Sequence, residues 1–266
     1  LEMLQIHGWG TGCAALALIL LLGGASGCAT SNPRADSRQD ERRAYAHFNM
    51  AADHIKNDRL ELAVRELLMA ERLDPENQRV QHSLAIAFLR KGKQAEAEER
   101  FERVLDLNPR ALEVRFNLSS LYLNQGRYAG CIEQSKLLFD DPTFTAPWRA
   151  LNNWGYCAYR LGDLAVAREQ LGYARDHNGS YWPTLMNLGI LEQEQGNKME
   201  AIRSFEQVLG LSPGSNATAE VNYRLAEIYV SMGKRHEAMG YLRTAVVKAP
   251  NGPWGKKSEE YLKALR

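Results

Sequence analysis

A period of about 34 residues recurs along most of this chain, and it restricts the possible fold more than any other feature. Pro75 and Pro109 lie 34 residues apart, and Pro142, Pro213 and Pro250 follow at one or two similar intervals. Such a period indicates stacked copies of one small structural unit. The units that align are residues 44–77, 78–111, 112–147, 148–181, 182–218 and 219–250.

Small side chains occupy the same two positions in every unit. The eighth position holds Ala51, Ala85, Ser119, Gly155, Gly189 and Ala226, and the twentieth holds Ala63, Ala97, Cys131, Ala167, Ala201 and Ala238. Helix axes approach closely only where the side chains between them are small. We therefore expect each unit to be a hairpin of two helices that cross at these positions.

Glycine at the fifteenth position predicts the turn between the two helices. The residues are Gly92, Gly126, Gly162, Gly196 and Gly233, with Asp58 in the first unit. Large apolar residues fill the seventh position (Met50, Leu84, Leu118, Trp154, Leu188, Leu225) and the twenty-fourth (Leu67, Phe101, Leu171, Phe205, Leu242), where Ser135 is the exception. These columns are expected to form the core.

The five columns resemble those of the tetratricopeptide repeat, over residues 44–250. That resemblance implies an all-α fold, a right-handed α-solenoid of six repeats. Residues 251–266 carry Trp254, Tyr261, Leu262 and Leu265 at roughly helical spacing and are expected to be a C-terminal capping helix. Glycines that recur in five of the six units exclude a coiled coil, which needs sustained heptads.

The first 27 residues are typical of an export signal. The apolar run 13–22 is too short to span a bilayer as a helix. It ends in Gly-Gly-Ala-Ser-Gly before Cys28, which resembles a bacterial lipobox. The resemblance implies that residues 1–27 are removed and that Cys28 carries the lipid anchor. Neither Ala29 nor Thr30 is the aspartate of an inner-membrane retention signal, so an outer-membrane location facing the periplasm is expected.

Two features depart from the usual lipobox: Ala25 stands where leucine is commonest, and only His7 takes the place of lysine or arginine before the apolar run. The alternative is an ordinary secretory signal in which Cys28 has no role. Residues 28–43 contain many charges and no bulky apolar side chain, so we expect a flexible tether between the anchor and the repeats.

Composition and motifs argue against several classes of function. The chain has 33 basic and 32 acidic residues and a net charge of +1, which does not favour a nucleic-acid partner. No motif of a nucleotide-binding loop, a zinc protease or a serine hydrolase is present. We therefore expect no catalytic residue, no cofactor, no metal site and no small-molecule substrate.

Two cysteines are expected to lie close together. Cys131 belongs to the second helix of unit three and Cys157 to the first helix of unit four, and these helices are expected to pack against each other. In an oxidising compartment they could form a disulfide, while the alternative is a pair of buried free thiols.

A partner-binding groove follows from the resemblance, because the first helices of tetratricopeptide repeats line one face of the solenoid. In units one to three this face carries an apolar set: Tyr45, Phe48, Ile55, Ile86, Leu89, Phe116 and Leu123. A helix or extended segment of a partner protein could lie on it. The alternative is that several of these residues, among them Ile55, Leu89 and Leu123, only seal neighbouring units together.

Six such repeats behind a lipobox resemble the type IV pilus pilotins of the PilF, PilW and Tgl family. The resemblance implies an outer-membrane lipoprotein that binds secretin subunits and promotes their assembly for pilus formation and motility, without catalysis. An alternative within the same class is an adaptor lipoprotein of another envelope machine, for outer-membrane protein assembly or peptidoglycan synthesis. An enzyme with a site carried on the repeats is the competing class, and no clustered acid, base or nucleophile supports it.

Overall fold

The structure is a computed structural model, and it describes residues 33–265. The expected signal peptide, Cys28 and the first part of the expected tether lie outside the described residues. From residue 40 onward the chain forms one compact unit. No helix within the described residues is both long and apolar enough to span a membrane.

The described part of the chain contains thirteen α-helices and no strand. In chain order they are α1 (Pro33–Lys56), α2 (Leu60–Leu73), α3 (Gln78–Arg90), α4 (Gln94–Leu107), α5 (Leu112–Asn124), α6 (Tyr128–Phe139), α7 (Pro147–Arg160), α8 (Leu164–His177), α9 (Trp182–Glu194), α10 (Lys198–Gly210), α11 (Ser215–Ser231), α12 (Arg235–Lys248) and α13 (Pro253–Ala264). The prediction of an all-α fold is confirmed.

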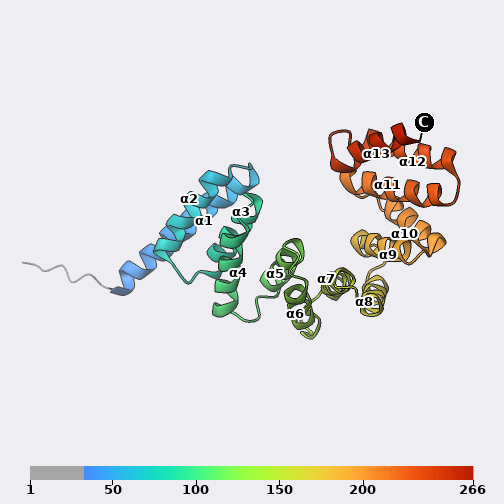
Figure 1. Cartoon of the computed structure of the whole chain (residues 1–266). Coiled ribbons are helices and arrows are strands. Elements are labelled where there is room, and N and C mark those ends of the chain that lie inside the picture. The colour runs from blue at the N-terminus through green and yellow to red at the C-terminus, as the bar shows by residue number, and fades with distance from the viewer. Residues whose placement is uncertain (1–32, 266) are drawn as a thin grey trace, which may run out of the picture. The chain divides into compact units, whose positions relative to one another are not determined.

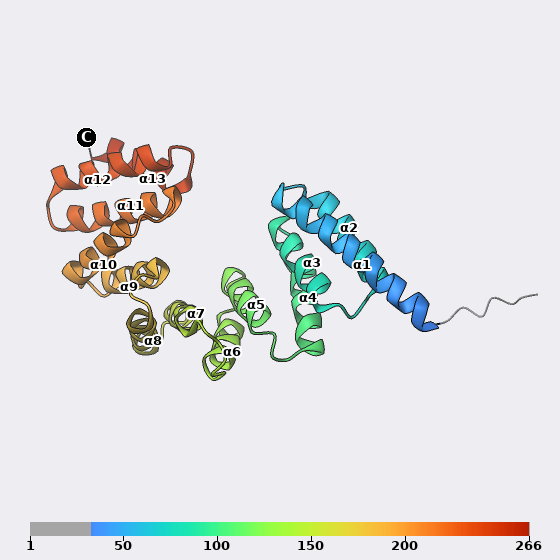
Figure 2. The same ribbon diagram turned by 180° about the vertical axis from the view of Figure 1, so that it is seen from behind.

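The helices are arranged as six hairpins followed by one further helix (Figure 1). Helices α3–α12 pack as five hairpins, and each second helix contacts the first helix of the next hairpin. The last helix, α13, packs on both α11 and α12, as the opposite view also shows (Figure 2). The order of these contacts is that of a solenoid of tetratricopeptide type, in which each unit buries its apolar face against its neighbours.

Close helix contact explains the column of small residues at the eighth position. A Cβ atom added to Gly189 of α9 would lie 2.5 Å from the Phe205 ring of α10, and one added to Gly155 would lie 2.7 Å from Leu171. Phe205 and Leu171 are fully buried residues of the twenty-fourth column. In these two hairpins the eighth position therefore meets the twenty-fourth, whereas the sequence predicted that it meets the twentieth.

Backbone conformation explains the glycines at the fifteenth position. All five have a φ angle between +74° and +85°, which is the left-handed region that favours glycine. In the first hairpin Asp58 takes the same conformation with φ +56°. Aspartate tolerates this region better than most side chains, so the turn is kept without glycine.

The sequence predicted a flexible tether over residues 28–43, but residues 33–43 belong to helix α1. Low apolar content suggested disorder, but these residues extend a helix that the first repeat already nucleates, and propagation is much easier than nucleation. Proline at the first helical position is compatible with such a start, and an Arg43–Asp40 pair of 3.2 Å links successive turns.

The junction between the third and fourth hairpins has a polar core. Ser135 replaces the large apolar residue of the twenty-fourth column, and its hydroxyl lies 2.8 Å from that of Ser119. The Asn153 amide donates to the same Ser119 hydroxyl at 3.3 Å. Beside this cluster Cys131 of α6 and Cys157 of α7 are fully buried and paired as a disulfide, with Cα atoms 6.6 Å apart.

Candidate protein-binding face

Successive first helices contact one another through side chains at the repeat spacing. Arg90 of α3 donates to the Ile55 carbonyl oxygen of α1 at 3.0 Å. His82 of α3 lies 3.0 Å from the Asn117 amide of α5. Helices α1, α3 and α5 therefore present one continuous face, and the residues predicted to form a groove come from these three helices.

The seven predicted groove residues differ in how accessible they are. Tyr45 is 58% exposed, whereas the other six are half-buried. The core between the first two repeats contacts Phe48, Ile55 and Leu89. The next core contacts Ile86, Leu89 and Leu123. The Phe116 ring packs against Leu138, Phe144 and Ala150. These six residues therefore seal the repeats together and still expose part of each side chain, and their role in binding stays a prediction.

Two arginines cover aromatic rings of this face, which was not predicted. The Arg79 guanidinium carbon lies 4.8 Å from the centre of the Phe48 ring, and that of Arg149 lies 3.7 Å from the centre of the Phe116 ring. Arginine attracts the negative face of an aromatic ring. In both contacts the arginine is at position two of its repeat and the phenylalanine is at position five of the preceding repeat. This pairing of positions in neighbouring repeats is the sequence signal for such contacts.

The arginines change the chemistry of the face from apolar to mixed. Arg149 also pairs with the Glu113 carboxylate at 3.1 Å, and burial lowers the pKa of the neighbouring His82 while Glu113 opposes that shift. A segment that binds here meets cationic groups and aromatic surface together. Aromatic residues and arginine are the residue types that most often dominate the energy of protein interfaces.

The later first helices form a wetter face. The Tyr159 hydroxyl donates to the Glu194 carboxylate, and burial together with this bond raises the pKa of Tyr159. Tyr223 packs against Trp254 of α13, with ring centres 5.2 Å apart. Within the described residues no group of three or more His, Cys, Asp or Glu side chains is placed to bind a metal ion.

Comparisons with known proteins agree with the repeat architecture. The sequence model of the tetratricopeptide repeat matches residues 82–130 and 186–253. The type IV pilus assembly protein PilF of Pseudomonas aeruginosa is 23% identical over 219 residues, covering 80% of this chain and 86% of PilF. The solved structure of P. aeruginosa PilF superposes with a TM-score of 0.68 at 15% identity, over 84% of this chain and 99% of that one.

Other solved structures share the fold. PilW, described as a widely conserved type IV pilus biogenesis factor, has a TM-score of 0.70 at 17% identity, covering 80% of this chain and 97% of PilW. A chain of the APC/C Cut9–Hcn1 hetero-tetramer also has a TM-score of 0.70, at 18% identity over 87% of this chain and 45% of that one.

The hairpins, their small-residue contacts and the matched repeats define the class: the chain carries tetratricopeptide repeats and has a solenoid fold of the tetratricopeptide type. Proteins of this class bind other proteins. Within it the chain is related in sequence to the type IV pilus assembly protein PilF and has the fold of PilF and PilW.

Proposed function

We propose that this protein is a pilotin, a non-catalytic scaffold that binds secretin subunits and promotes their assembly in the outer membrane for type IV pilus biogenesis. In this proposal a lipid on Cys28 anchors the protein to the outer membrane, and the repeats face the periplasm. The observation that carries the proposal is the sequence relation to PilF, which extends over 80% of this chain and 86% of PilF.

The sequence relation carries more weight than the fold. PilW and the Cut9–Hcn1 chain superpose equally well, each with a TM-score of 0.70, although one is a pilus biogenesis factor and the other a subunit of the APC/C. A tetratricopeptide fold is a scaffold that accepts many partners. Only the alignment along nearly the whole of PilF distinguishes a pilus role from these others.

The first-helix face suggests how a secretin subunit is held. Tyr45 offers an exposed aromatic surface, and Arg79 adds positive charge beside Phe48, while Arg149, paired with Glu113, covers Phe116. We infer that the bound segment carries apolar and acidic side chains, laid along α1, α3 and α5 as a helix or an extended strand. The anchor keeps this face at the membrane into which the partner inserts.

Deletion of the gene tests the proposal, with heat-resistant secretin multimers and surface pili as readouts. We expect both to fall strongly in the deletion strain and to return when the intact gene is supplied. If the multimers stay at the parental level, the pilotin proposal is wrong. A loss of outer-membrane proteins or of wall synthesis instead would favour the adaptor of another envelope machine.

A second experiment tests the anchor by itself. Metabolic labelling with radioactive palmitate should label the intact protein and should not label the Cys28→Ala variant. Equal labelling of both proteins, or none of either, would show that Cys28 is not the lipidated residue.

A further inference from the structure

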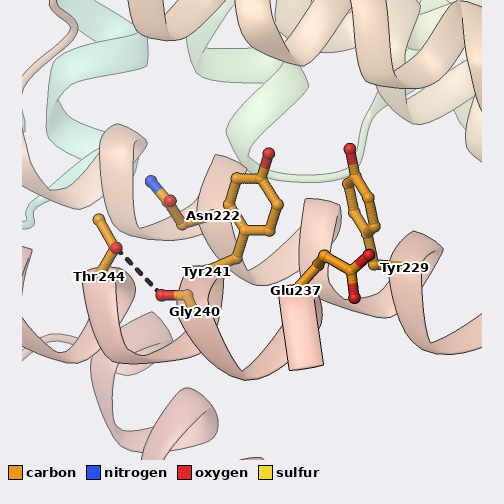
Figure 3. Close-up of a pocket in the computed structure, with 6 residues that line it drawn as sticks. All are labelled: Asn222, Tyr229, Glu237, Gly240, Tyr241 and Thr244. Atoms are coloured by element: carbon orange, nitrogen blue, oxygen red, sulfur yellow. Dashed lines mark hydrogen bonds between the residues drawn. The ribbon is translucent and has the colours of Figure 1, made fainter. Parts of the chain in front are cut away.

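A pocket lies between the two helices of the last repeat (Figure 3). Its volume is about 390 Å³, and its lining residues are Asn222 and Tyr229 from α11 and Glu237, Gly240, Tyr241 and Thr244 from α12. The two tyrosine rings stand side by side, with centres 5.1 Å apart and their hydroxyl groups pointing the same way. This pocket belongs to a different repeat from the predicted groove and shares no residue with it.

Asn222 presents an unused hydrogen-bond acceptor to the pocket. The residue is only 3% exposed, and its amide nitrogen donates to the Thr218 carbonyl oxygen at 2.8 Å. No residue in the described part of the chain donates to its side-chain oxygen. An amide oxygen that lines a pocket and has no donor within the protein can accept a hydrogen bond from a ligand or from water.

The charges near the pocket are mainly negative. Glu237 lines it, and neither Glu237 nor the nearby Glu206 of α10 forms an ion pair with another described residue. Burial and a hydrogen bond with Tyr229 raise the pKa of Tyr241 to about 12, and the Glu206 charge contributes to this shift. Lys234 supplies a cation nearby, with its ammonium nitrogen 5.6 Å from the centre of the Tyr229 ring.

The repeat fold itself does not require this pair of tyrosines. Tyr229 and Tyr241 occupy the eleventh and twenty-third positions of their repeat, and no other repeat has an aromatic residue at both. The twenty-third position elsewhere holds polar residues, namely Glu66, Arg100, Gln134, Gln170 and Ser204. The rings do cover part of the core between the fifth and sixth repeats, so stability must be measured alongside binding.

We propose that this pocket is a second protein-binding site and that it receives an arginine side chain of a partner polypeptide. A guanidinium group is planar, carries five donors and stacks on aromatic faces. It would donate to the Glu237 carboxylate while one face lies on Tyr241, and a neighbouring donor of the same partner segment would reach the Asn222 oxygen at the other end of the pocket. This site goes beyond the proposed function and does not depend on it, because any arginine-bearing partner satisfies the chemistry.

The test is an NMR titration of the full-length protein with the peptide acetyl-Gly-Arg-Gly-amide and with the same peptide containing citrulline. Citrulline has nearly the same shape but no charge. We expect saturable shifts of α11 and α12 amide signals with the arginine peptide, and at least fivefold weaker binding of the citrulline peptide. Equal affinity for both peptides, or no saturable shift with arginine, would overturn the proposal.

Two variants locate the site. Glu237→Gln should weaken binding of the arginine peptide at least threefold, whereas Glu96→Gln, at the same position of the second repeat, should leave it unchanged. Glu237 is exposed, and Glu96 is half-buried and forms a surface ion pair with Lys93 at 2.8 Å. Such surface pairs contribute little to stability, so both variants should stay close to the parental melting temperature. If Glu96→Gln weakens binding as much as Glu237→Gln does, the arginine peptide does not bind at this pocket.

Discussion

At the residue scale, the fold depends on positions where a single added methyl group has no space. A Cβ atom at Gly189 would lie within 2.9 Å of three atoms of the buried Phe205 ring. We expect Gly189→Ala to lower the free energy of unfolding by about 1–3 kcal/mol, because either the ring or the helix axis must move. Thermal unfolding followed by circular dichroism measures this effect.

Gly172→Ala is the matched control, since Gly172 lies on α8 and an added Cβ atom would meet nothing within 4 Å. It should be neutral or should stabilise by up to about 1 kcal/mol, because alanine favours helix more than glycine does. If both alanine variants melt at the same temperature, the close contact between the two columns is not what selects glycine at position 189.

The sequence predicted contacts inside one repeat better than contacts between repeats. Gly155 and Gly189 were identified because the eighth position is small in every unit. The contacts of arginine with Phe48 and Phe116 were not predicted, because each of them joins position two of one unit to position five of the preceding unit. Aligning the units shows what each position shares but does not show which positions of neighbouring units meet.

At the element scale, the disulfide joins α6 to α7 where the core is least apolar. It closes a loop of 26 residues, which corresponds to about 3.5 kcal/mol in the chain-entropy treatment of the unfolded state. We expect dithiothreitol to lower the melting temperature of the parent protein clearly. The Cys131→Ala/Cys157→Ala double variant should already melt at the lower temperature and should not respond to dithiothreitol.

Mass spectrometry of protein alkylated without reduction gives an independent check of the same bond. The disulfide predicts that neither Cys131 nor Cys157 takes up the alkylating reagent. Complete alkylation of both residues in freshly isolated protein would mean that they are buried free thiols, the alternative that the sequence left open.

Helix α13 packs on the two helices of the last repeat, and we expect this packing to stabilise that repeat. Leu262 is 9% exposed and packs with Ala226, Ala238 and Leu242. Leu262→Ala should therefore cost about 2–3 kcal/mol, whereas Val247→Ala, at a residue that is 77% exposed, should change stability by less than about 0.5 kcal/mol. Similar melting temperatures for the two variants would argue against a capping role.

Helix positions followed from the sequence except at the first helix. The turns were found from glycine and proline, whose backbone preferences are strong and local. The start of α1 at Pro33 was missed because charged residues without an apolar face are compatible both with coil and with a helix that continues from a packed segment. Whether residues 33–43 are coil or helix depends on the packed part of α1, near Ala44 and Ala51.

At the scale of the whole molecule, architecture and function are separate conclusions. Each repeat packs chiefly on its neighbours, so the array is a scaffold whose partners depend on exposed side chains. The six-unit architecture could be derived from spacing alone. The binding face was predicted only as a set of positions, because the exposure of Tyr45 and the burial of the other groove residues depend on packing between repeats.

Direct binding of the secretin subunit to the purified protein tests the central claim, and two exposed tyrosines provide a matched pair. Tyr45 on the first-helix face is 58% exposed, and Tyr173 on the second helix α8 is 49% exposed. The account predicts that Tyr45→Ala weakens secretin binding about fivefold or more, in the range of an interface anchor, and that Tyr173→Ala does not. Unchanged binding by Tyr45→Ala, or equal loss in both variants, would contradict it.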